Sequence, residues 1–137
     1  MIIVVDTNII ISALIKESII RKLILNKNFE FITPSYTLSE IEKYKNEICK
    51  KANMTYKEFY LLLDKLFNYI KIMNINFYSN YLKEAKKSIS DIKDVPFLAC
   101  ALAFNAVIWS DDQHFKQQKR VKALTTKEMH DLVNVEE

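Results

Sequence analysis

The chain has 137 residues, of which 50% are hydrophobic and 27% are charged, with a formal net charge of +3. These values are typical of one globular domain spanning residues 1–137, and they exclude a disordered or fibrous protein. No apolar stretch is long enough to span a bilayer, and residues 1–5 lack the basic start and the length of a secretory signal. We therefore expect a soluble, cytoplasmic protein with no membrane partner.

The basic residues permit nucleic-acid binding without requiring it. All of them except Arg21 and Arg120 are lysines, which direct charge toward phosphates but do not read bases in a bidentate manner. The two cysteines, Cys49 and Cys100, are isolated and have no spacing typical of a zinc or redox site, so we expect buried thiols on helices.

The absence of glycine restricts both motifs and turns. It excludes a P-loop and a Rossmann fingerprint, because both need glycine. Left-handed backbone positions must be filled by the next most tolerant residues, chiefly asparagine. We expect four such positions, at Asn28, Asn74, Asn80 and Asn105.

The first strand is the clearest element. Ile2, Ile3, Val4 and Val5 form a continuous apolar run, which is typical of a strand buried on both faces of a parallel sheet. Residues 8–26 then predict one helix or a broken pair, and residues 29–32 a short strand. Thr33 and Pro34 are expected to begin the next helix, with the proline in its first turn.

The second half of the chain repeats this alternation. Thr55 to Glu58 has the form of a capping box, and it opens an apolar helix that we expect to continue to Ile70. The wide apolar face of residues 59–70 indicates deep burial or an interface, and we expect a homodimer or a bound protein partner there. The remaining elements are expected in the order strand 71–73, helix 77–89, helix 97–104, strand 106–109, strand 121–124 and a terminal helix ending near residue 133.

Strands that alternate with helices predict an α/β fold, a three-layer α/β/α sandwich with a central parallel sheet. Asp6 ends the first strand, and Asp111 and Asp112 follow the strand 106–109. Glu40 and Asp94 are expected in the first turns of helices. If the two apolar strands are neighbours, all of these acids meet at the carboxyl edge of the sheet, where α/β proteins bind ligands.

Carboxylates gathered in one small space repel each other, and divalent cations such as Mg²⁺ and Mn²⁺ relieve that repulsion. Such a site fits metal-assisted hydrolysis of phosphodiesters. Each acid also has a structural interpretation: Asp6 and Asp94 as helix caps, Glu40 as a solvated surface residue and Asp111 with Asp112 as a turn. His114 and His130 are interpreted as surface or helix-end residues.

The ordered motifs resemble the PIN domain family. They are DTN after the first strand, SEI containing Glu40, DVPFLACAL from Asp94, and IWSDDQHF at the end of the strand 106–109. The resemblance covers nearly the whole chain and implies a PIN-like fold, Mg²⁺ or Mn²⁺ dependence and cleavage of single-stranded RNA. Many small family members are VapC-type toxins that an antitoxin holds inactive, so an antitoxin is an expected partner.

The resemblance also assigns residues. Asp6, Glu40, Asp94 and Asp112 match the four acids of the family, as catalytic residues and metal ligands, with Glu40 binding a second metal or positioning water. Three further residues are expected beside them: Asn8, Ser110 and Asp91. Asp111 stands where the family commonly has a small residue, so either Asp111 or Asp112 is the ligand, and the alignment of Ser110 with a family hydroxyl favours Asp112.

Three other functions are compatible with parts of this pattern. A non-catalytic PIN-like module would bind RNA or protein and use the acids structurally, and a housekeeping RNA-processing nuclease would share the chemistry without a toxin role. A phosphoacceptor receiver domain also gathers acids at strand ends, but it needs an acceptor aspartate on a middle strand. Residues 29–32 offer none.

Overall fold

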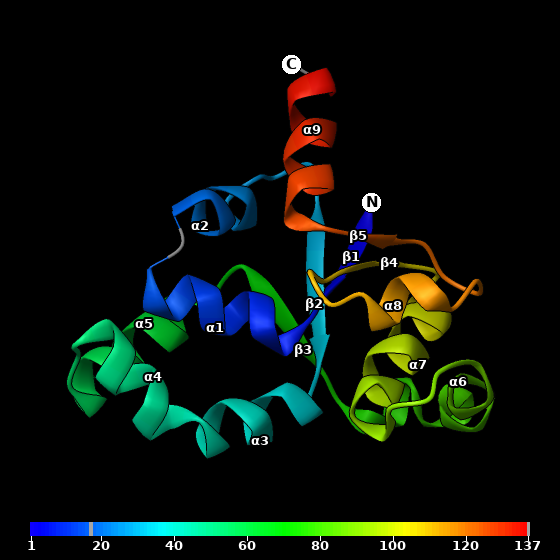
Figure 1. The fold of residues 1–137 in the computed structure, drawn as a ribbon, viewed down its shortest axis with the longest axis horizontal. Helices are drawn as coiled ribbons and strands as arrows, with labels where there is room; N and C mark the ends of the chain where they lie inside the picture. Colours follow the sequence, from blue (N-terminus) through cyan, green and yellow to red (C-terminus); the bar gives the residue numbers. More distant parts are fainter. Residues whose placement is uncertain (17, 137) are drawn as a thin grey trace.

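The computed structural model describes residues 1–16 and 18–136, and its strands form one parallel sheet in the order β3-β2-β1-β4-β5 (Figure 1). Their bounds are β1 Ile2–Val5, β2 Glu30–Pro34, β3 Ile70–Met73, β4 Val107–Trp109 and β5 Ala123–Leu124. The predicted parallel sheet is confirmed.

Helices cover both faces of the sheet, as the sequence predicts. The α-helices are α1 Thr7–Ile15, α2 Ser18–Ile24, α3 Tyr36–Lys43, α4 Lys45–Ala52, α5 Tyr56–Leu66, α6 Leu82–Ser88, α7 Val95–Phe104, α8 His114–Gln117 and α9 Thr126–Glu136. Short 3₁₀ segments lie at η1 Ile75–Phe77, η2 Ser79–Tyr81 and η3 Ile92–Asp94. Figure 1 shows α1 to α5 on one side of the strands and α6 to α8 on the other.

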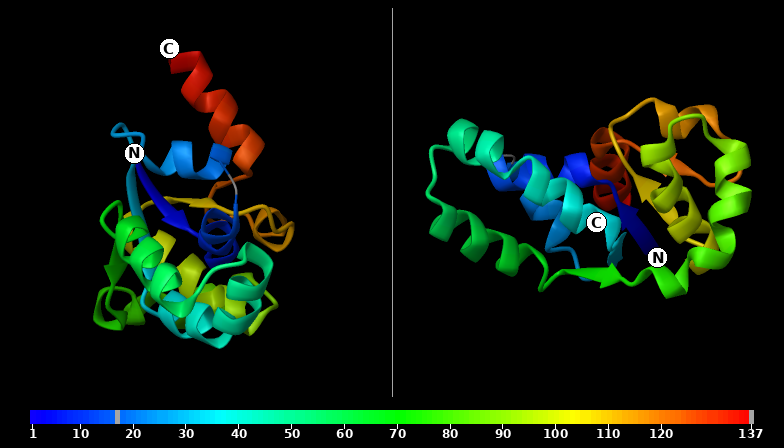
Figure 2. Two further views of the ribbon diagram at one scale, coloured as in Figure 1. Left: turned by 90° about the vertical axis from the view of Figure 1, so that its left-hand side faces the viewer. Right: turned by 90° about the horizontal axis from the view of Figure 1, so that it is seen from below.

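The hydrophobic core is divided by the sheet. Ile3 and Val5 of β1 pack into one cluster with α1, α4 and α5, whereas Val4 packs into the opposite cluster with α7. All three side chains have no exposed surface, because successive residues of a strand face opposite sides. The continuous apolar run therefore reflects a strand covered on both faces. The views in Figure 2 show α4 and α5 at one end of the molecule and α9 projecting from another.

Two helix predictions are confirmed by hydrogen bonds and by backbone angles. The Thr55 hydroxyl accepts a bond from the Glu58 amide over 3.1 Å, and the Glu58 carboxylate accepts one from the Thr55 amide over 3.0 Å. Asn105 ends α7 in the left-handed region with φ of 51°. Cys49 and Cys100 are free, buried and located on helices, as expected.

Other local predictions are wrong. Among the described residues, only Asn53 and Asn105 have positive φ, so Asn28, Asn74 and Asn80 do not substitute for glycine. Asn53 ends α4 and was not anticipated, because the apolar pattern of that helix gives no clear end.

Several element boundaries also differ from prediction. Thr33 and Pro34 belong to β2, and the helix begins only at Tyr36, because a residue before proline favours extended backbone and proline is tolerated at a strand end. The predicted helix through Ile70 ends at Leu66, and Ile70 begins β3. The region 8–26 forms a pair of helices, which agrees with the broken-pair alternative.

Within residues 1–16 and 18–136, no helix combines the length and the apolar character that crossing a membrane requires.

Candidate functional site

The central strand β1 pairs with β2 on one side and with β4 on the other, so the strand order reverses next to it. Val5 lies beside Trp109 in the register of β1 and β4, which places Asp6 and Ser110 next to each other just beyond the strand ends. Ligands of open α/β sheets bind at this kind of switch point.

A pocket of about 230 Å³ opens at this edge of the sheet. Five carboxylates line it: Asp6, Glu40, Asp91, Asp94 and Asp112. They come from the end of β1, from α3, from both ends of η3 and from the segment after β4. The structure thus brings together the four acids that the sequence predicted, together with Asp91. Asn8, the first-turn residue of α1 that was expected beside them, also lines the pocket.

Asp6 is the most deeply buried acid of the pocket, with 7% of its surface exposed. Its Oδ2 accepts a hydrogen bond from the Ser110 hydroxyl over 2.7 Å. The pKa of Asp6 is raised to about 7, mainly by burial and to a smaller degree by the charges of Asp94, Glu40 and Asp112, against the lowering effect of the Ser110 bond. Although Asp6 occupies the position before α1, its side chain caps no amide of that helix. The helix-cap interpretation of Asp6 is therefore wrong.

Asp94 follows the same pattern on the opposite side of the pocket. It is 8% exposed, ends η3 and makes no capping bond to α7. Burial is the largest cause that raises the pKa of Asp94 to about 6, followed by the charge of Asp91. Asp91 begins η3, where its Oδ1 accepts a bond from the Lys93 amide over 3.0 Å. Asp91 therefore fixes the turn that carries Asp94 and also contributes its own charge to the pocket.

Glu40 reaches the pocket from the second turn of α3 rather than from the first turn that was expected. The buried Thr7 hydroxyl donates a bond to Glu40 Oε1 over 2.6 Å, and Thr7 Oγ1 also lies 3.2 Å from Thr37 Oγ1. Thr33 Oγ1 is 2.7 Å from Thr37 and donates to the Val5 carbonyl over 2.9 Å. This row of threonine hydroxyls ties α3 and its glutamate to the end of β1.

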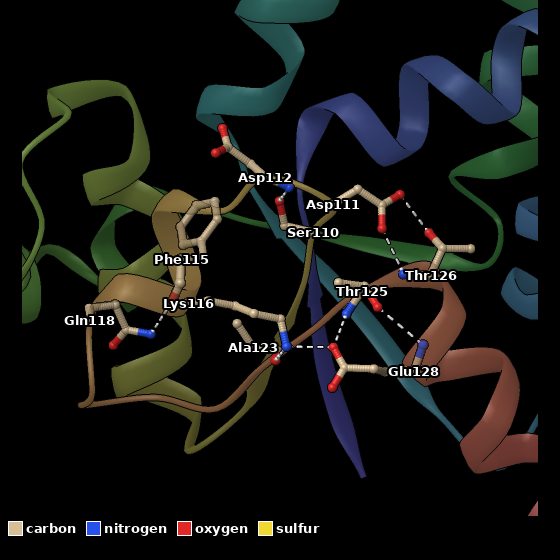
Figure 3. A network of polar contacts seen from close by, with 10 residues as sticks. All are labelled: Ser110, Asp111, Asp112, Phe115, Lys116, Gln118, Ala123, Thr125, Thr126 and Glu128. Atoms are coloured by element: carbon tan, nitrogen blue, oxygen red, sulfur yellow. Dashed lines mark hydrogen bonds and ion pairs between the residues drawn. The ribbon is translucent and has the colours of Figure 1, made fainter.

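The two consecutive aspartates after β4 have different surroundings (Figure 3). The Asp111 carboxylate points toward the start of α9, where it accepts bonds from the Thr126 amide over 2.7 Å and from the Thr126 hydroxyl over 2.8 Å. Asp112 lines the pocket, and its amide donates to Ser110 Oγ over 3.0 Å. Asp111 therefore stabilises a helix end, and the geometry favours Asp112 as the site residue.

Sequence reasoning gave no site role to four further lining residues, Thr7, Tyr44, Lys93 and Phe97, or to His114 beside Asp94. Among the lining residues of the described chain, Lys93 alone carries a positive charge. His114 is exposed and begins α8, as interpreted from the sequence, but its Nδ1 lies 3.2 Å from Asp94 Oδ2. His114 follows Asp112 by two residues in the sequence, and this closeness was the sequence feature that could have placed it near the site.

These residues fit a divalent cation. Most of the charge in the pocket is negative, and burial of Asp6 and Asp94 beside other carboxylates makes their ionisation costly without a counter-charge, which raises the pKa of both. Carboxylate oxygens are the ligands that Mg²⁺ and Mn²⁺ prefer. Asp91, Asp94 and His114 also place one ligand atom each within 4.8 Å of the others.

The solved structures that are similar to this chain include two described as VapBC. One is described as VapBC2 from Rickettsia felis bound to a DNA fragment from their promoter; it is 23% identical, with a TM-score of 0.69, over 91% of this chain and 98% of the other. The other is VapBC-1 from nontypeable Haemophilus influenzae, which is 20% identical with a TM-score of 0.66 over 93% and 99% of the two chains. At these identities the likeness establishes the fold.

No curated protein sequence matches the chain significantly. The sequence profile of the family described as the PIN domain, however, matches residues 4–133, which is nearly the whole chain and includes every carboxylate of the pocket. The protein therefore belongs to the PIN domain family.

Proposed function

We propose that this protein is a metal-dependent endoribonuclease that cleaves phosphodiester bonds of single-stranded RNA. The observation that carries the proposal is the convergence of five carboxylates, from four separate parts of the chain, in one pocket at the carboxyl edge of the sheet. Membership of the PIN family supports nuclease activity in general. The choice of RNA as substrate follows from the family resemblance of the motifs.

In this proposal, Asp6, Asp94 and Asp112 hold Mg²⁺ or Mn²⁺, and Asp91 adds negative charge to the pocket. A bound ion of this kind supplies positive charge toward the phosphoryl oxygens and lowers the pKa of coordinated water. The Ser110 hydroxyl orients Asp6 and, through the Asp112 amide, the segment that carries Asp112. Such outer hydrogen bonds commonly fix the orientation of metal ligands.

The remaining lining residues act on the substrate and on water. Glu40, held by the Thr7 hydroxyl, binds a second metal ion or positions the attacking water. Lys93 contacts a non-bridging phosphate oxygen, since it is the cation among the lining residues. Asn8 supplies an amide that orients water or a carboxylate. By the family resemblance, the products carry a 5′-phosphate and a 3′-hydroxyl.

We further propose a VapC-type toxin role with an antitoxin partner, and a homodimer. The fold likeness to two structures described as VapBC supports the antitoxin. Exposed apolar side chains on and beside α5 support a protein interface: Tyr56, Tyr60, Leu61 and Tyr69 are each at least 40% exposed. Phe59, Leu63 and Leu66, in contrast, face the core. Light scattering after size-exclusion chromatography tests the dimer, and a monomeric mass at all concentrations contradicts it.

A toxin role makes a genomic prediction that separates it from housekeeping RNA processing. We expect a small reading frame encoding an antitoxin next to this gene, and co-expression of its product should abolish cleavage. An isolated gene whose product processes one cellular RNA would favour the housekeeping nuclease instead.

The nuclease proposal is tested with the Asp6→Asn variant, which keeps the size of the side chain and an acceptor for Ser110. Labelled single-stranded RNA is incubated with Mn²⁺ and the wild type, the Asp6→Asn variant, or Asp64→Asn as a matched control on the exposed surface of α5. We expect cleavage by the wild type and the control, none by Asp6→Asn, and none in EDTA. Full activity of Asp6→Asn contradicts the proposed site.

A non-catalytic module gives a different result in the same experiment. It predicts RNA or protein binding without cleavage by any of the three proteins, whether or not Mn²⁺ is present. Cation-dependent protection against thermal unfolding, lost in Asp6→Asn, identifies a working metal site independently of the RNA chosen.

A further inference from the structure

His114 lies beside two carboxylates of the acidic pocket, and the proposed nuclease mechanism does not use it. Its Nδ1 is 3.2 Å from Asp94 Oδ2 and 3.5 Å from Asp112 Oδ1. Asp91, Asp94 and His114 each offer one ligand atom, and these three atoms lie within 4.8 Å of one another. Two ligands of one octahedral cation at adjacent positions lie roughly 3 Å apart. The 3.2 Å between His114 Nδ1 and Asp94 Oδ2, a hydrogen bond in this structure, is close to the spacing of two ligands of one ion.

The backbone holds the three donor residues in place. The His114 amide donates to Asp112 Oδ1 over 2.9 Å at the start of α8, which fixes the turn between β4 and that helix. On the other side, Asp91 Oδ1 accepts the bond from the Lys93 amide that closes η3, and Asp94 ends the same segment. The imidazole and the two carboxylates thus project from two short, hydrogen-bonded turns that face each other.

The buried part of the pocket holds a further carboxylate, Asp6. Asp6 is 7% exposed, and in the described part of the chain its side chain accepts a single bond, from Ser110, and caps no amide of α1. In the described residues no buried side-chain oxygen lacks a hydrogen-bond partner, so the other oxygen of Asp6 keeps access to the pocket that Asp94 shares. A positive charge in the pocket favours the ionised form of a carboxylate buried to this degree.

We propose that His114, Asp91 and Asp94 bind a divalent transition-metal ion of the Mn²⁺ class through one imidazole nitrogen and two carboxylates, and that His114 makes the pocket prefer Mn²⁺ over Mg²⁺. The reason is the ligand chemistry: Mg²⁺ demands oxygen ligands, whereas imidazole suits first-row transition metals. The inference rests on the proposed function only in placing a cation in this pocket, and it adds a nitrogen ligand and a metal preference.

Pulsed electron paramagnetic resonance of bound Mn²⁺ tests the nitrogen ligand directly, because a coordinated imidazole gives a ¹⁴N modulation that changes on ¹⁵N labelling of histidine. The chain has two histidines, and His130 on α9 provides the matched control. In the His130→Gln variant His114 is the remaining histidine. We expect the nitrogen modulation in the wild type and in His130→Gln, and its loss in His114→Gln.

Calorimetric titration of the metal-free full-length protein measures the preference. We expect the Mg²⁺ dissociation constant divided by the Mn²⁺ dissociation constant to fall about tenfold or more in His114→Gln, which means that the preference for Mn²⁺ is lost. The same ratio should stay unchanged in His130→Gln. Because His114 is half exposed, the substitution should leave the fold intact, which circular dichroism checks. If His114→Gln does not fold, the ¹⁵N substitution in His130→Gln still decides the assignment.

The outcomes separate this inference from the proposed function. Mn²⁺ that binds the wild type without nitrogen modulation overturns the role of His114 and leaves the carboxylate site in place. Failure of the wild type to bind Mn²⁺ or Mg²⁺ at all, with Asp6→Asn behaving identically, overturns both.

Discussion

The hydroxyl of Ser110 donates a hydrogen bond to Oδ2 of Asp6 over 2.7 Å, which joins two residues 104 positions apart in the chain. The same oxygen of Ser110 accepts a hydrogen bond from the amide of Asp112 over 3.0 Å. One small side chain thus links the acid after β1 to the acid after β4. The pairing of β1 with β4 makes this contact possible, because it brings Val5 and Trp109 into register.

Substituting Ser110 by alanine should weaken cation binding. The hydrogen bond from Ser110 lowers the pKa of Asp6, so its loss raises that pKa further and removes the group that orients both acids. We expect the Mn²⁺ dissociation constant at pH 7 to rise by about 10–100-fold, as for other residues that orient metal ligands. Calorimetric titration measures it, with the exposed Ser79→Ala as control. Equal affinities for the two variants would show that Ser110 is dispensable.

Asp6→Asn should stabilise the metal-free protein above neutral pH. The pKa of Asp6 is about 7 in the folded protein, above its ordinary value of 3.8, so between pH 4 and pH 7 the folded state binds more protons than the unfolded state. Stability therefore falls as the pH rises through this window, and asparagine removes that loss. We expect a gain on the order of 2–4 kcal/mol at pH 8 that disappears near pH 4.

Thermal unfolding in EDTA at pH 4, 6 and 8 measures this effect for the wild type and the variant. A melting temperature of Asp6→Asn at or below that of the wild type at pH 8 would show that the ionised carboxylate has a stabilising partner within the protein. Asp6→Asn is also expected to lose the protection that Mn²⁺ gives the wild type. With added Mn²⁺, the wild type should therefore have the higher melting temperature of the two proteins.

Thr7 should matter for catalysis through its hydroxyl. It donates to Glu40 Oε1 over 2.6 Å and is buried at the start of α1. Thr7→Val keeps the volume but removes the donor, and we expect kcat to fall by about 10–100-fold, with little change in KM. Thr7→Ser restores the donor and should recover most of the rate. If Thr7→Ser is as impaired as Thr7→Val, the methyl group and its packing matter rather than the hydrogen bond.

The two aspartates after β4 should have separable effects. Asp111→Ala removes the acceptor of the Thr126 amide and hydroxyl at the start of α9, so we expect a loss of about 1 kcal/mol in the free energy of unfolding and unchanged Mn²⁺ affinity. Asp112→Asn should show the reverse, with weaker Mn²⁺ binding and a smaller change in stability. Urea unfolding and calorimetric titration of both variants measure the two effects. Loss of Mn²⁺ binding in Asp111→Ala would reassign the ligand.

Local sequence patterns predicted the layers of this fold, because they follow from periodicity and from capping. The four apolar residues of β1 indicated a strand buried on both faces, and the capping box at Thr55 located the start of α5. Boundaries were less predictable where two preferences compete. The apolar run of α5 continues into β3, and the sheet rather than the helix takes Ile70.

The sequence by itself determined which acids are available and that they follow strands or helix starts, since these are properties of single segments. Only the tertiary structure decided how they are used. Asp111 and Asp112 are chemically identical neighbours, and the start of α9 engages one while the other lines the pocket. His114 likewise lies within hydrogen-bond distance of Asp94, twenty residues earlier in the chain. Side-chain direction at the end of a strand depends on contacts distant in sequence, and no local pattern encodes them.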